Sequence, residues 1–427
     1  MTPAARTAAT IEILTEIGRG DAPADAVLAD WFRGHRFAGS GDRRAIREAV
    51  YADFRTGALR RWAVQAADGD PDNPRLRVIA GLALETSGEV ATLFDGAGYG
   101  PPPLSSEEQG LSETVGKLDM AAAPDHVNGN CPADLYPLFV DQWDEAAADE
   151  LTALNQTASV DLRVNTLRAT REEAQARLAA DGYDAAPTPY SASGLRGTAR
   201  GNFQQLGAYR AGMIDPQDES SQLVTMLVDA GPGLRVLDYC AGAGGKALAL
   251  AAASANQAEI VACDVSRSRL AHMEPRAARL GVAGVRSLAV PADEAPEELK
   301  NWADRVLIDA PCSGTGTWRR SPDMRWRTSP EAIAAYTHEQ DKLLDIAATM
   351  LRAGGRIIYA VCSVLESEGR ARVDAFLARH PDYLRLPIKD VLGPEMVARL
   401  GCDEDLVLTP MRHNTDGMYG AVLARRP

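Results

Sequence analysis

The 427-residue sequence has few cysteines for its length, and its six cysteines are scattered. None of them forms a C-x-x-C pair and the histidines show no ligand spacing, so we expect no metal site. Sparse cysteines in a long chain are typical of reduced thiols in the cytoplasm. The N-terminus lacks the apolar core of a signal peptide, and no run approaches the roughly 20 apolar residues of a spanning helix. We therefore expect a cytoplasmic protein without a membrane segment.

An excess of positive charge is also lacking, because the net charge is -14. Any surface that binds nucleic acid must therefore be a local basic patch. The hydrophobic content of 45% is enough for well-filled cores, and the length favours two or three domains. We predict three, at residues 1–125, 131–214 and 215–427.

Residues 1–125 read as an all-helical domain, in which Ile11, Leu14 and Ile17 recur at helical spacing. Between Arg33 and Arg61 the sequence holds eight arginines and three acidic residues. This run is either a solvated helix face or a surface that contacts phosphates. Residues 131–214 then alternate like a strand at 159–166 and continue as a helix at 168–182, which indicates a small α+β domain.

From residue 215 onward, strand and helix patterns alternate, which predicts an α/β domain with a doubly wound, parallel sheet. The expected strands are 235–240, 259–265, 285–290, 305–310 and 355–363. The expected helices are 246–255, 267–280 and 330–352.

The first of these strands leads into a glycine turn, Gly242-x-Gly244-x-x-Ala247, and Asp264 follows at the end of the second strand. This arrangement fits an adenosine cofactor, so the turn alone admits both NAD and S-adenosylmethionine. Asp238, Asp264, Asp293 and Asp309 stand at or near the ends of successive strands. Such an electronegative rim repels a pyrophosphate and suits a sulfonium cation, which favours S-adenosylmethionine.

Two further strands end close to thiols, Cys312 after the strand 305–310 and Cys362 within 355–363. A thiolate that adds to C6 of cytosine makes C5 able to attack a methyl donor, and a base must then remove the C5 proton. Cys312 and Cys362 are therefore candidates for covalent catalysis on a pyrimidine. The remaining thiols are expected to be small hydrophobic side chains; they are Cys131, Cys240, Cys263 and Cys402.

These motifs resemble those of the Sun-type RNA cytosine-C5 methyltransferases. The matching segments are 217–222, 240–246, Asp264, Asp293, 309–316 (Asp-Ala-Pro-Cys-Ser-Gly-Thr-Gly), 361–363 and 416–419. Residues 163–166 (Arg-Val-Asn-Thr) resemble the small domain that precedes the catalytic domain in this family. The helical N-terminal part, with Gly41-Asp-Arg-Arg44, is similar to the NusB-like domain of bacterial members that act on small-subunit ribosomal RNA.

The resemblance implies a class I S-adenosylmethionine-dependent methyltransferase (Rossmann-like) catalytic domain, preceded by an all-helical NusB-like domain and a small α+β (RRM-like) domain. It implies that Cys362 is the nucleophile, that Cys312 assists product release, that Asp309 faces the cytosine N3 edge and that Lys246 orients the site. It also implies a set of residues that hold S-adenosylmethionine: Cys240, Ala241, Gly242, Ala243, Gly244, Gly245, Lys246, Asp264, Asp293 and Asp309.

The expected substrate is RNA, with small-subunit ribosomal RNA favoured, and the protein is expected to act as a monomer. The RNA side of the site is expected to hold Arg319, Arg320, Arg325 and Trp326, together with Trp318 and Arg327. The alternative for these residues is a surface helix start with core tryptophans.

The sequence departs from the family pattern at Gly242-Ala243, where Ala-Pro is usual, and at Val361, where threonine is usual. DNA cytosine methyltransferases use the Pro-Cys thiol as nucleophile, so an exchange of roles between Cys312 and Cys362 stays open. Two other functions also stay open, a nicotinamide oxidoreductase and a catalytically idle RNA-binding assembly factor.

Overall fold

The computed structural model describes residues 1–20, 22–85, 90–198 and 203–426. They form two compact units, one of Met1–Gln156 with Arg320–Ser329 and one of Thr157–Arg319 with the chain from Pro330 onward. This division differs from the three predicted domains in three respects. Residues 131–156, predicted as part of the small domain, group with the helical unit, and residues 157–214 group with the α/β domain. Arg320–Ser329, expected in the α/β domain, belongs to the first unit.

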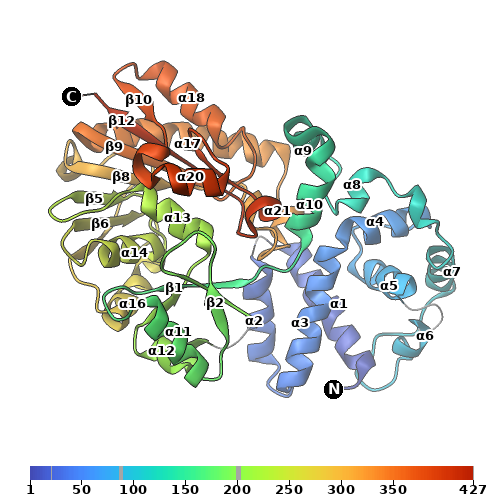
Figure 1. The fold of residues 1–427 in the computed structure, drawn as a ribbon. Coiled ribbons are helices and arrows are strands. Elements are labelled where there is room, and N and C mark those ends of the chain that lie inside the picture. The colour runs from blue at the N-terminus through green and yellow to red at the C-terminus, as the bar shows by residue number, and fades with distance from the viewer. Residues whose placement is uncertain (21, 86–89, 199–202, 427) are drawn as a thin grey trace. The chain divides into compact units, whose positions relative to one another are not determined.

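The first unit is helical, as predicted (Figure 1). Its helices are α1 (Pro3–Arg19), α2 (Ala24–Gly34), α3 (Ser40–Arg55), α4 (Gly57–Ala66), α5 (Pro74–Glu85), α6 (Val90–Leu93), α7 (Ser106–Val115), α8 (Asp125–Asn128), α9 (Tyr136–Trp143) and α10 (Ala147–Asn155), with short 3₁₀ turns η1 (Met120–Ala122), η2 (Asp144–Ala146) and η6 (Met324–Trp326).

Helix α1 shows how the local sequence starts such an element. The side chain of Thr2 accepts a hydrogen bond from the N–H of Ala5, and Pro3 occupies the first turn, where no intrahelical donor is lost. Ile13, Leu14 and Ile17 lie on one face and are buried in the core of the unit. The spacing that predicted the helix therefore also supplies its packing face.

The second unit begins with a small antiparallel sheet of strand order β2-β3-β1-β4. Its elements are β1 (Val160–Val164), α11 (Arg171–Ala180), β2 (Ala185–Pro187), β3 (Gly194–Gly197), η3 (Phe203–Gln205), α12 (Gly207–Arg210) and β4 (Ile214–Pro216). The predicted strand 159–166 is β1 and the predicted helix 168–182 is α11, which starts in a capping box between Thr170 and Glu173.

The larger sheet of the second unit has the strand order β10-β12-β9-β8-β5-β6-β7 (Figure 1). Its strands are β5 (Arg235–Asp238), β6 (Glu259–Asp264), β7 (Val285–Ala289), β8 (Ala303–Asp309), β9 (Leu351–Val361), β10 (Tyr383–Leu386) and β12 (Met418–Arg425), and β11 (Leu406–Leu408) pairs with β12. Strands β5 to β9 run parallel, as predicted.

Helices flank this sheet and connect its strands. They are α13 (Glu219–Leu227), α14 (Gly245–Ala253), α15 (Arg267–Ala271), α16 (Met273–Leu280), α17 (Pro330–Met350), α18 (Arg370–Arg379), α19 (Lys389–Leu392), α20 (Pro394–Leu400) and α21 (Pro410–His413), with 3₁₀ turns η4 (Glu297–Leu299) and η5 (Thr315–Thr317). The predicted helix 267–280 is divided at His272, and Pro275 follows in the first turn of α16, where a proline is tolerated.

Strands β8 and β9 lie in the middle of the sheet and are buried on both faces. Leu307 and Ile358 pack into one hydrophobic cluster, whereas Ile308 and Tyr359 pack into the other. Successive side chains of a strand point to opposite faces of the sheet. A strand whose side chains are buried on both faces must therefore be covered by packed elements on both sides. This double cover fixes the ends of β8 and β9 rigidly.

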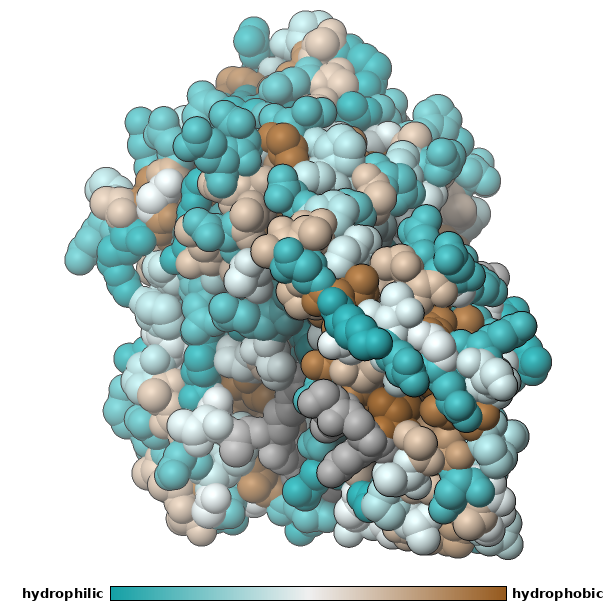
Figure 2. Space-filling model, turned by 90° about the vertical axis from the view of Figure 1, so that its right-hand side faces the viewer, coloured by the Kyte–Doolittle hydropathy of each residue, from teal (hydrophilic) through white to brown (hydrophobic). Residues whose placement is uncertain are grey.

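The surface is mixed in polarity, and Figure 2 shows one face on which hydrophilic residues surround smaller hydrophobic patches. Large apolar side chains that are exposed include Phe37, Tyr99 and Val265. Among the described residues, no helix is both long and apolar enough to cross a bilayer.

Candidate active site

The carboxyl ends of the parallel strands bring charged side chains to one edge of the sheet. Asp238 ends β5, Asp264 ends β6 and Asp309 ends β8, as expected from the sequence. In open α/β sheets, ligands bind beyond this edge. Asp293 lies farther along, in the exposed loop after β7.

The two candidate thiols meet at this edge, with the Sγ atoms of Cys312 and Cys362 3.4 Å apart. The register of the strands explains this distance. Asp309 on β8 pairs with Ala360 on β9, and the N–H of Ala310 donates to the carbonyl of Ala360. The predicted convergence of the two sulfurs is therefore observed, while their chemical roles stay predictions.

Lys246 and Asp309 form an ion pair beside the thiols, with Nζ 2.5 Å from Oδ2. Lys246 comes from the first turn of α14, directly after the glycine turn. Burial alone would lower the pKa of the Lys246 ammonium, but Asp309, Asp238 and Cys362 together raise it above its ordinary value. Lys246 therefore stays a cation, and its charge acts on Cys362.

Asp238 is a fully buried carboxyl group close to this ion pair. Burial raises the pKa of Asp238 from 3.8 to about 7, and Asp309 adds to the rise, whereas Lys246 opposes it. Near neutral pH the group can thus be present as acid or as carboxylate. A buried acid of this kind in a cleft is typical of functional sites.

The surroundings of Cys312 are different. A hydrogen bond with Cys362 raises the pKa of the Cys312 thiol well above its ordinary value, and burial and the carboxylate of Glu368 act in the same direction. The thiol form of Cys312 is therefore favoured, next to a Cys362 that faces a cation.

The glycine turn between β5 and α14 needs two left-handed residues, Gly242 with φ +56° and Gly244 with φ +76°. A Cβ atom at Gly244 would also overlap Met273. The carboxylate of Asp264 accepts a hydrogen bond of 2.8 Å from the N–H of Gly242 and so fixes the turn. A side chain at either glycine would be strained, which explains why the sequence keeps them.

A pocket of about 320 Å³ opens at the turn. Of the residues predicted to hold the cofactor, those that line it are Cys240, Ala241, Ala243, Gly245, Lys246 and Asp309. The lining does not include Gly242, Gly244, Asp264 or Asp293, whose assignment stays a prediction. Six further lining residues were not in the predicted cofactor-binding set, although Asp238 was expected at the electronegative rim: Pro216, Gln217, Asp218, Ser221, Asp238 and Arg276. Three of these stand in the family-like segment 217–222, so the sequence carried a signal for them.

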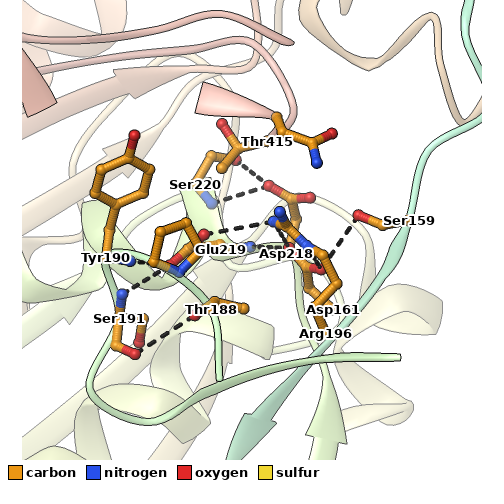
Figure 3. A network of polar contacts seen from close by, with 12 residues as sticks. Ser159, Asp161, Thr188, Tyr190, Ser191, Arg196, Asp218, Glu219, Ser220 and Thr415 are labelled. Atoms are coloured by element: carbon orange, nitrogen blue, oxygen red, sulfur yellow. Dashed lines mark hydrogen bonds and ion pairs between the residues drawn. The ribbon is translucent and has the colours of Figure 1, made fainter. Parts of the chain in front are cut away.

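The small sheet holds one wall of the pocket through a buried polar network (Figure 3). Arg196 on β3 makes two hydrogen bonds, of 2.7 and 2.8 Å, to Asp161 on β1, and it also reaches Glu219 at 3.4 Å. The carboxylate of Glu219 accepts further hydrogen bonds from the N–H groups of Tyr190 and Ser191. Because Glu219 begins α13, the network fixes that helix start next to the pocket.

Asp218 caps α13 and completes this wall. Its carboxylate accepts from the N–H of Ser220 at 2.9 Å and from the N–H of Asp416 at 3.1 Å. Opposite, Arg276 donates to the carbonyl of Ala243 at 2.7 Å and to Asp215 on β4 at 2.6 Å. The small sheet therefore contacts two parts of the pocket lining, the start of α13 and Arg276. No sequence pattern indicated these contacts.

The predicted RNA-facing residues need a correction. Arg319 and Arg325 are buried, so neither lies on the surface of its unit. Arg319 donates to the carbonyl of Thr415, and Arg325 donates to the carbonyl of Asn130. Arg319 and Arg325 are close in the sequence but belong to different units, and each donates a hydrogen bond within its own unit.

The remaining residues of that run are divided. Trp318 is fully buried, as the alternative interpretation expected. Trp326 is half-buried in the helical unit and donates its indole N–H to the carbonyl of Phe54, with Arg61 over its ring. Arg320, Arg327 and Trp326 keep partial exposure, and their contact with RNA stays a prediction.

The other cysteines behave mostly as expected. Cys131 and Cys263 are buried, whereas Cys240 and Cys402 are half-buried, and among the described residues all six thiols are free. Burial and nearby carboxylates raise the pKa of Cys240 well above its ordinary value, which favours its thiol form.

Two parts of the chain match known protein families. Residues 225–424 match the family described as 16S rRNA methyltransferase RsmB/F, which confirms the predicted fold class of the catalytic domain. Residues 132–203 match the ferredoxin-like domain of RsmF/B-like methyltransferases, in agreement with the predicted small α+β domain.

Two relatives and one solved structure cover much of the chain. A probable ribosomal RNA small subunit methyltransferase B of Synechocystis is 30% identical over 97% of this chain and 98% of that protein. The ribosomal RNA small subunit methyltransferase B of Thermus thermophilus is 38% identical over 57% of this chain and 56% of that protein. The crystal structure of the protein PH0851 is similar in fold, with a TM-score of 0.79, 24% identity and 99% of both chains covered.

Proposed function

Because the chain belongs to the RsmB/F family of 16S rRNA methyltransferases, we propose that it methylates C5 of a cytosine in small-subunit ribosomal RNA through a covalent cysteine–C6 adduct. The observation that carries this proposal is the pair of thiols, 3.4 Å apart, at the same sheet edge as the Lys246–Asp309 ion pair.

The pocket at the glycine turn fits S-adenosylmethionine. Two left-handed glycines let the backbone approach a ligand closely, and Asp218, Asp238 and Asp309 line the pocket with carboxyl groups that suit a sulfonium cation. The residues proposed to hold it are Cys240 to Lys246, Asp264, Asp293 and Asp309, with Gln217 and Asp218 on the wall from α13. When bound, S-adenosylmethionine supplies the methyl group as an electrophile.

The first step proposed for the protein is addition of the Cys362 thiolate to C6 of the cytosine. The S–C6 bond forms, the C5–C6 double bond is broken, and N3 gains a proton from an acid on the Asp309 side of the site. The Lys246 ammonium, whose charge reaches Cys362, stabilises the thiolate before attack.

The second role belongs to Cys312, which assists product release. After methyl transfer the C5 proton must leave, so that the C5–C6 double bond returns and the S–C6 bond breaks. Cys312 is in contact with the Cys362 sulfur. Because its thiol form is favoured, Cys312 gives its proton to the Cys362 sulfur as the S–C6 bond breaks. The Cys312 thiolate formed in this way accepts the C5 proton, and the proton on N3 returns to the acid that supplied it.

The Val361 departure from the family pattern does not weaken this assignment. The Val361 side chain is fully buried in the core on one face of the sheet. A hydroxyl at this position would lie among apolar side chains such as Tyr359 and Ala421. This observation leaves little support for a catalytically idle RNA-binding factor.

The target cytosine must be unstacked, because C6 cannot be reached inside a duplex. Arg320 and Trp326 remain proposed RNA contacts, as do the arginines between Arg33 and Arg61, several of which are exposed on the first unit. The proposed location is the cytoplasm and the proposed state is a monomer.

The experiment is a methyl-transfer assay with purified protein, S-adenosylmethionine and small-subunit ribosomal RNA, read by mass spectrometry of the nucleosides. We expect 5-methylcytidine at one position. A methyl group on another atom or base would contradict the proposal, as would RNA binding without transfer. Tight binding of NADH in a parallel titration would instead support a nicotinamide oxidoreductase.

A further inference from the structure

Glu368 lies at the centre of a buried polar cluster beside the thiols and outside the pocket. Its side chain is 0% exposed. Ser313, the neighbour of Cys312, donates its N–H to Oε1 at 2.8 Å and its hydroxyl to Oε2. Ser363, the neighbour of Cys362, donates its hydroxyl to Oε2 at 2.6 Å. One carboxylate thus binds the residues that follow both thiols.

A third element joins the same carboxylate. Gln340 on α17 donates to Oε1 of Glu368 at 3.2 Å and to the carbonyl of Pro311 at 2.9 Å. Together with the two serines, Gln340 brings the number of hydrogen bonds on the carboxylate to four. An ionised carboxylate has about four lone-pair sites, so the cluster fits the charged form of Glu368.

The two thiol loops are also bound to each other directly. The hydroxyls of Thr315 and Ser363 lie 2.9 Å apart, and the N–H of Gly316 donates to the carbonyl of Cys362 at 3.1 Å. A Cβ at Gly316 would overlap the carbonyl of Gly417, so the close approach of the Cys312 loop to the segment just before β12 needs glycine at this position. The Glu368 cluster is the buried centre of this junction.

Burying a carboxylate costs free energy of folding, and apolar side chains of similar volume often join two loops with equal or greater stability. The charge has a second effect that an apolar side chain could not supply. The hydrogen bond to Cys362 and then burial raise the pKa of Cys312 most, and the charge of Glu368 adds to the rise. The titratable groups that face Cys312 are Cys362, Glu368 and Tyr359, whose own pKa is raised well above its ordinary value, by burial and then by Cys312.

We propose that Glu368 is a positioning residue of the methyl-transfer reaction, which holds the two thiols in contact through Ser313 and Ser363. Its charge also adds to the other influences that keep the proton on Cys312. Cys362 is then the thiol that is free to attack the base. This inference rests on the proposed function for its consequence in catalysis, but the geometry and the proton can be tested without RNA.

The first test separates charge from shape with Glu368→Gln, and Glu366→Gln is the matched control. Glu366 is an exposed acid in the same loop. Iodoacetamide labelling of Cys312, followed by peptide mass spectrometry across pH, needs neither RNA nor cofactor. In Glu368→Gln, we expect the pH at which half of Cys312 is labelled to be lower than in the wild type by about one unit or more. A shift of this size is typical when a neighbouring charge is lost. We expect no shift in Glu366→Gln.

The second test separates the length of the side chain from its charge. Glu368→Asp keeps the carboxylate group but shortens the side chain by one methylene. We expect kcat to fall about 100-fold, because a displacement of about 1 Å in reacting groups has effects of this size. We expect KM for RNA and for S-adenosylmethionine to change less than about twofold, because Glu368 lies outside the pocket. We also expect a protein–RNA adduct to accumulate, since release depends on Cys312.

The proposal is overturned if Glu368→Gln has the Cys312 labelling profile of Glu366→Gln, or if Glu368→Asp keeps full turnover. Should either Glu368 variant fail to fold, Ser313→Ala and Ser363→Ala each remove one hydroxyl from the cluster, and unchanged turnover in both overturns it equally. If the wild-type protein makes no 5-methylcytidine but the labelling shift occurs, the proposed function fails and the role of Glu368 in holding the proton stands.

Discussion

Cys312 and Cys362 are in contact, yet they face opposite charges. The ammonium of Lys246 interacts with Cys362, whereas the carboxylate of Glu368 interacts with Cys312. The two side chains, whose sulfurs are 3.4 Å apart, therefore have different electrostatic surroundings. This contrast supports the proposed attack by Cys362 and the proposed proton transfer by Cys312, and the variants below test it in order of decreasing effect.

The largest effect is expected for Cys362→Ala. Without its nucleophile the protein cannot activate C5, so turnover should fall by at least about 1,000-fold. The measurement is methyl transfer to ribosomal RNA under single-turnover conditions. Cys402→Ala, which removes a half-buried thiol remote from the sheet edge, is the control and should keep its rate. Normal turnover in Cys362→Ala would exclude its role as nucleophile.

For Cys312→Ala we expect a smaller loss of turnover, about 100-fold, and a new product. Attack and methyl transfer can still occur, but release loses its acid–base group, so a protein–RNA adduct should accumulate. The adduct is detected on denaturing gels with labelled RNA. If the adduct forms in Cys362→Ala instead, the roles of the two thiols are exchanged.

Lys246→Met removes the cation from the Cys362 side. The site then loses a positive charge that interacts with both Asp309 and Cys362, so the rate of methyl transfer should fall about 10- to 100-fold. The measurement is the single-turnover rate of methyl transfer, and Lys342→Met, at an exposed lysine of α17, is the control. A rate equal to that of Lys342→Met would exclude a role for the Lys246 charge in catalysis.

Asp238→Asn should give the smallest effect, on stability. In the folded protein the pKa of Asp238 is about 7 compared with 3.8 for an ordinary aspartate. Between these values the folded state binds a proton that the unfolded state has released, so this group makes the protein less stable as pH rises through the interval. Asparagine removes that dependence.

The measurement is thermal unfolding at about pH 5 and about pH 8. The melting temperature of Asp238→Asn relative to wild type should be higher at about pH 8 than at about pH 5. An equal difference at both pH values would show that Asp238 ionises normally in the folded protein.

Much of the catalytic fold could be predicted from the sequence, because the apolar runs of β5, β6, β8 and β9 end at acids or thiols. Parallel strands share one edge, so Cys312 and Cys362 were expected to meet. Strand β12 was not predicted, because it runs antiparallel to β9 and lies outside the strand–helix alternation that predicted the parallel strands. Its place in the sheet depends on its pairing with β9 and β10, which lie earlier in the chain.

Three features of the site also escaped the sequence, for one physical reason. Arg325 reads as a surface cation, but it is buried and binds the carbonyl of Asn130, far away in the chain. Glu368 reads as one more acid in a charged loop, but it is fully buried beside the thiols. Asp238 reads as the end of a strand, and only its burial makes it a weak acid. Local patterns do not report burial that distant segments create.

The most direct test of the account is to trap the adduct. Small-subunit ribosomal RNA that carries 5-fluorocytidine cannot lose its C5 substituent as a proton, so the covalent intermediate persists and its peptide can be mapped by mass spectrometry. We predict that the wild-type protein is linked to the RNA through Cys362. Linkage through Cys312, or no linkage in a protein that methylates the unmodified RNA, would contradict the account.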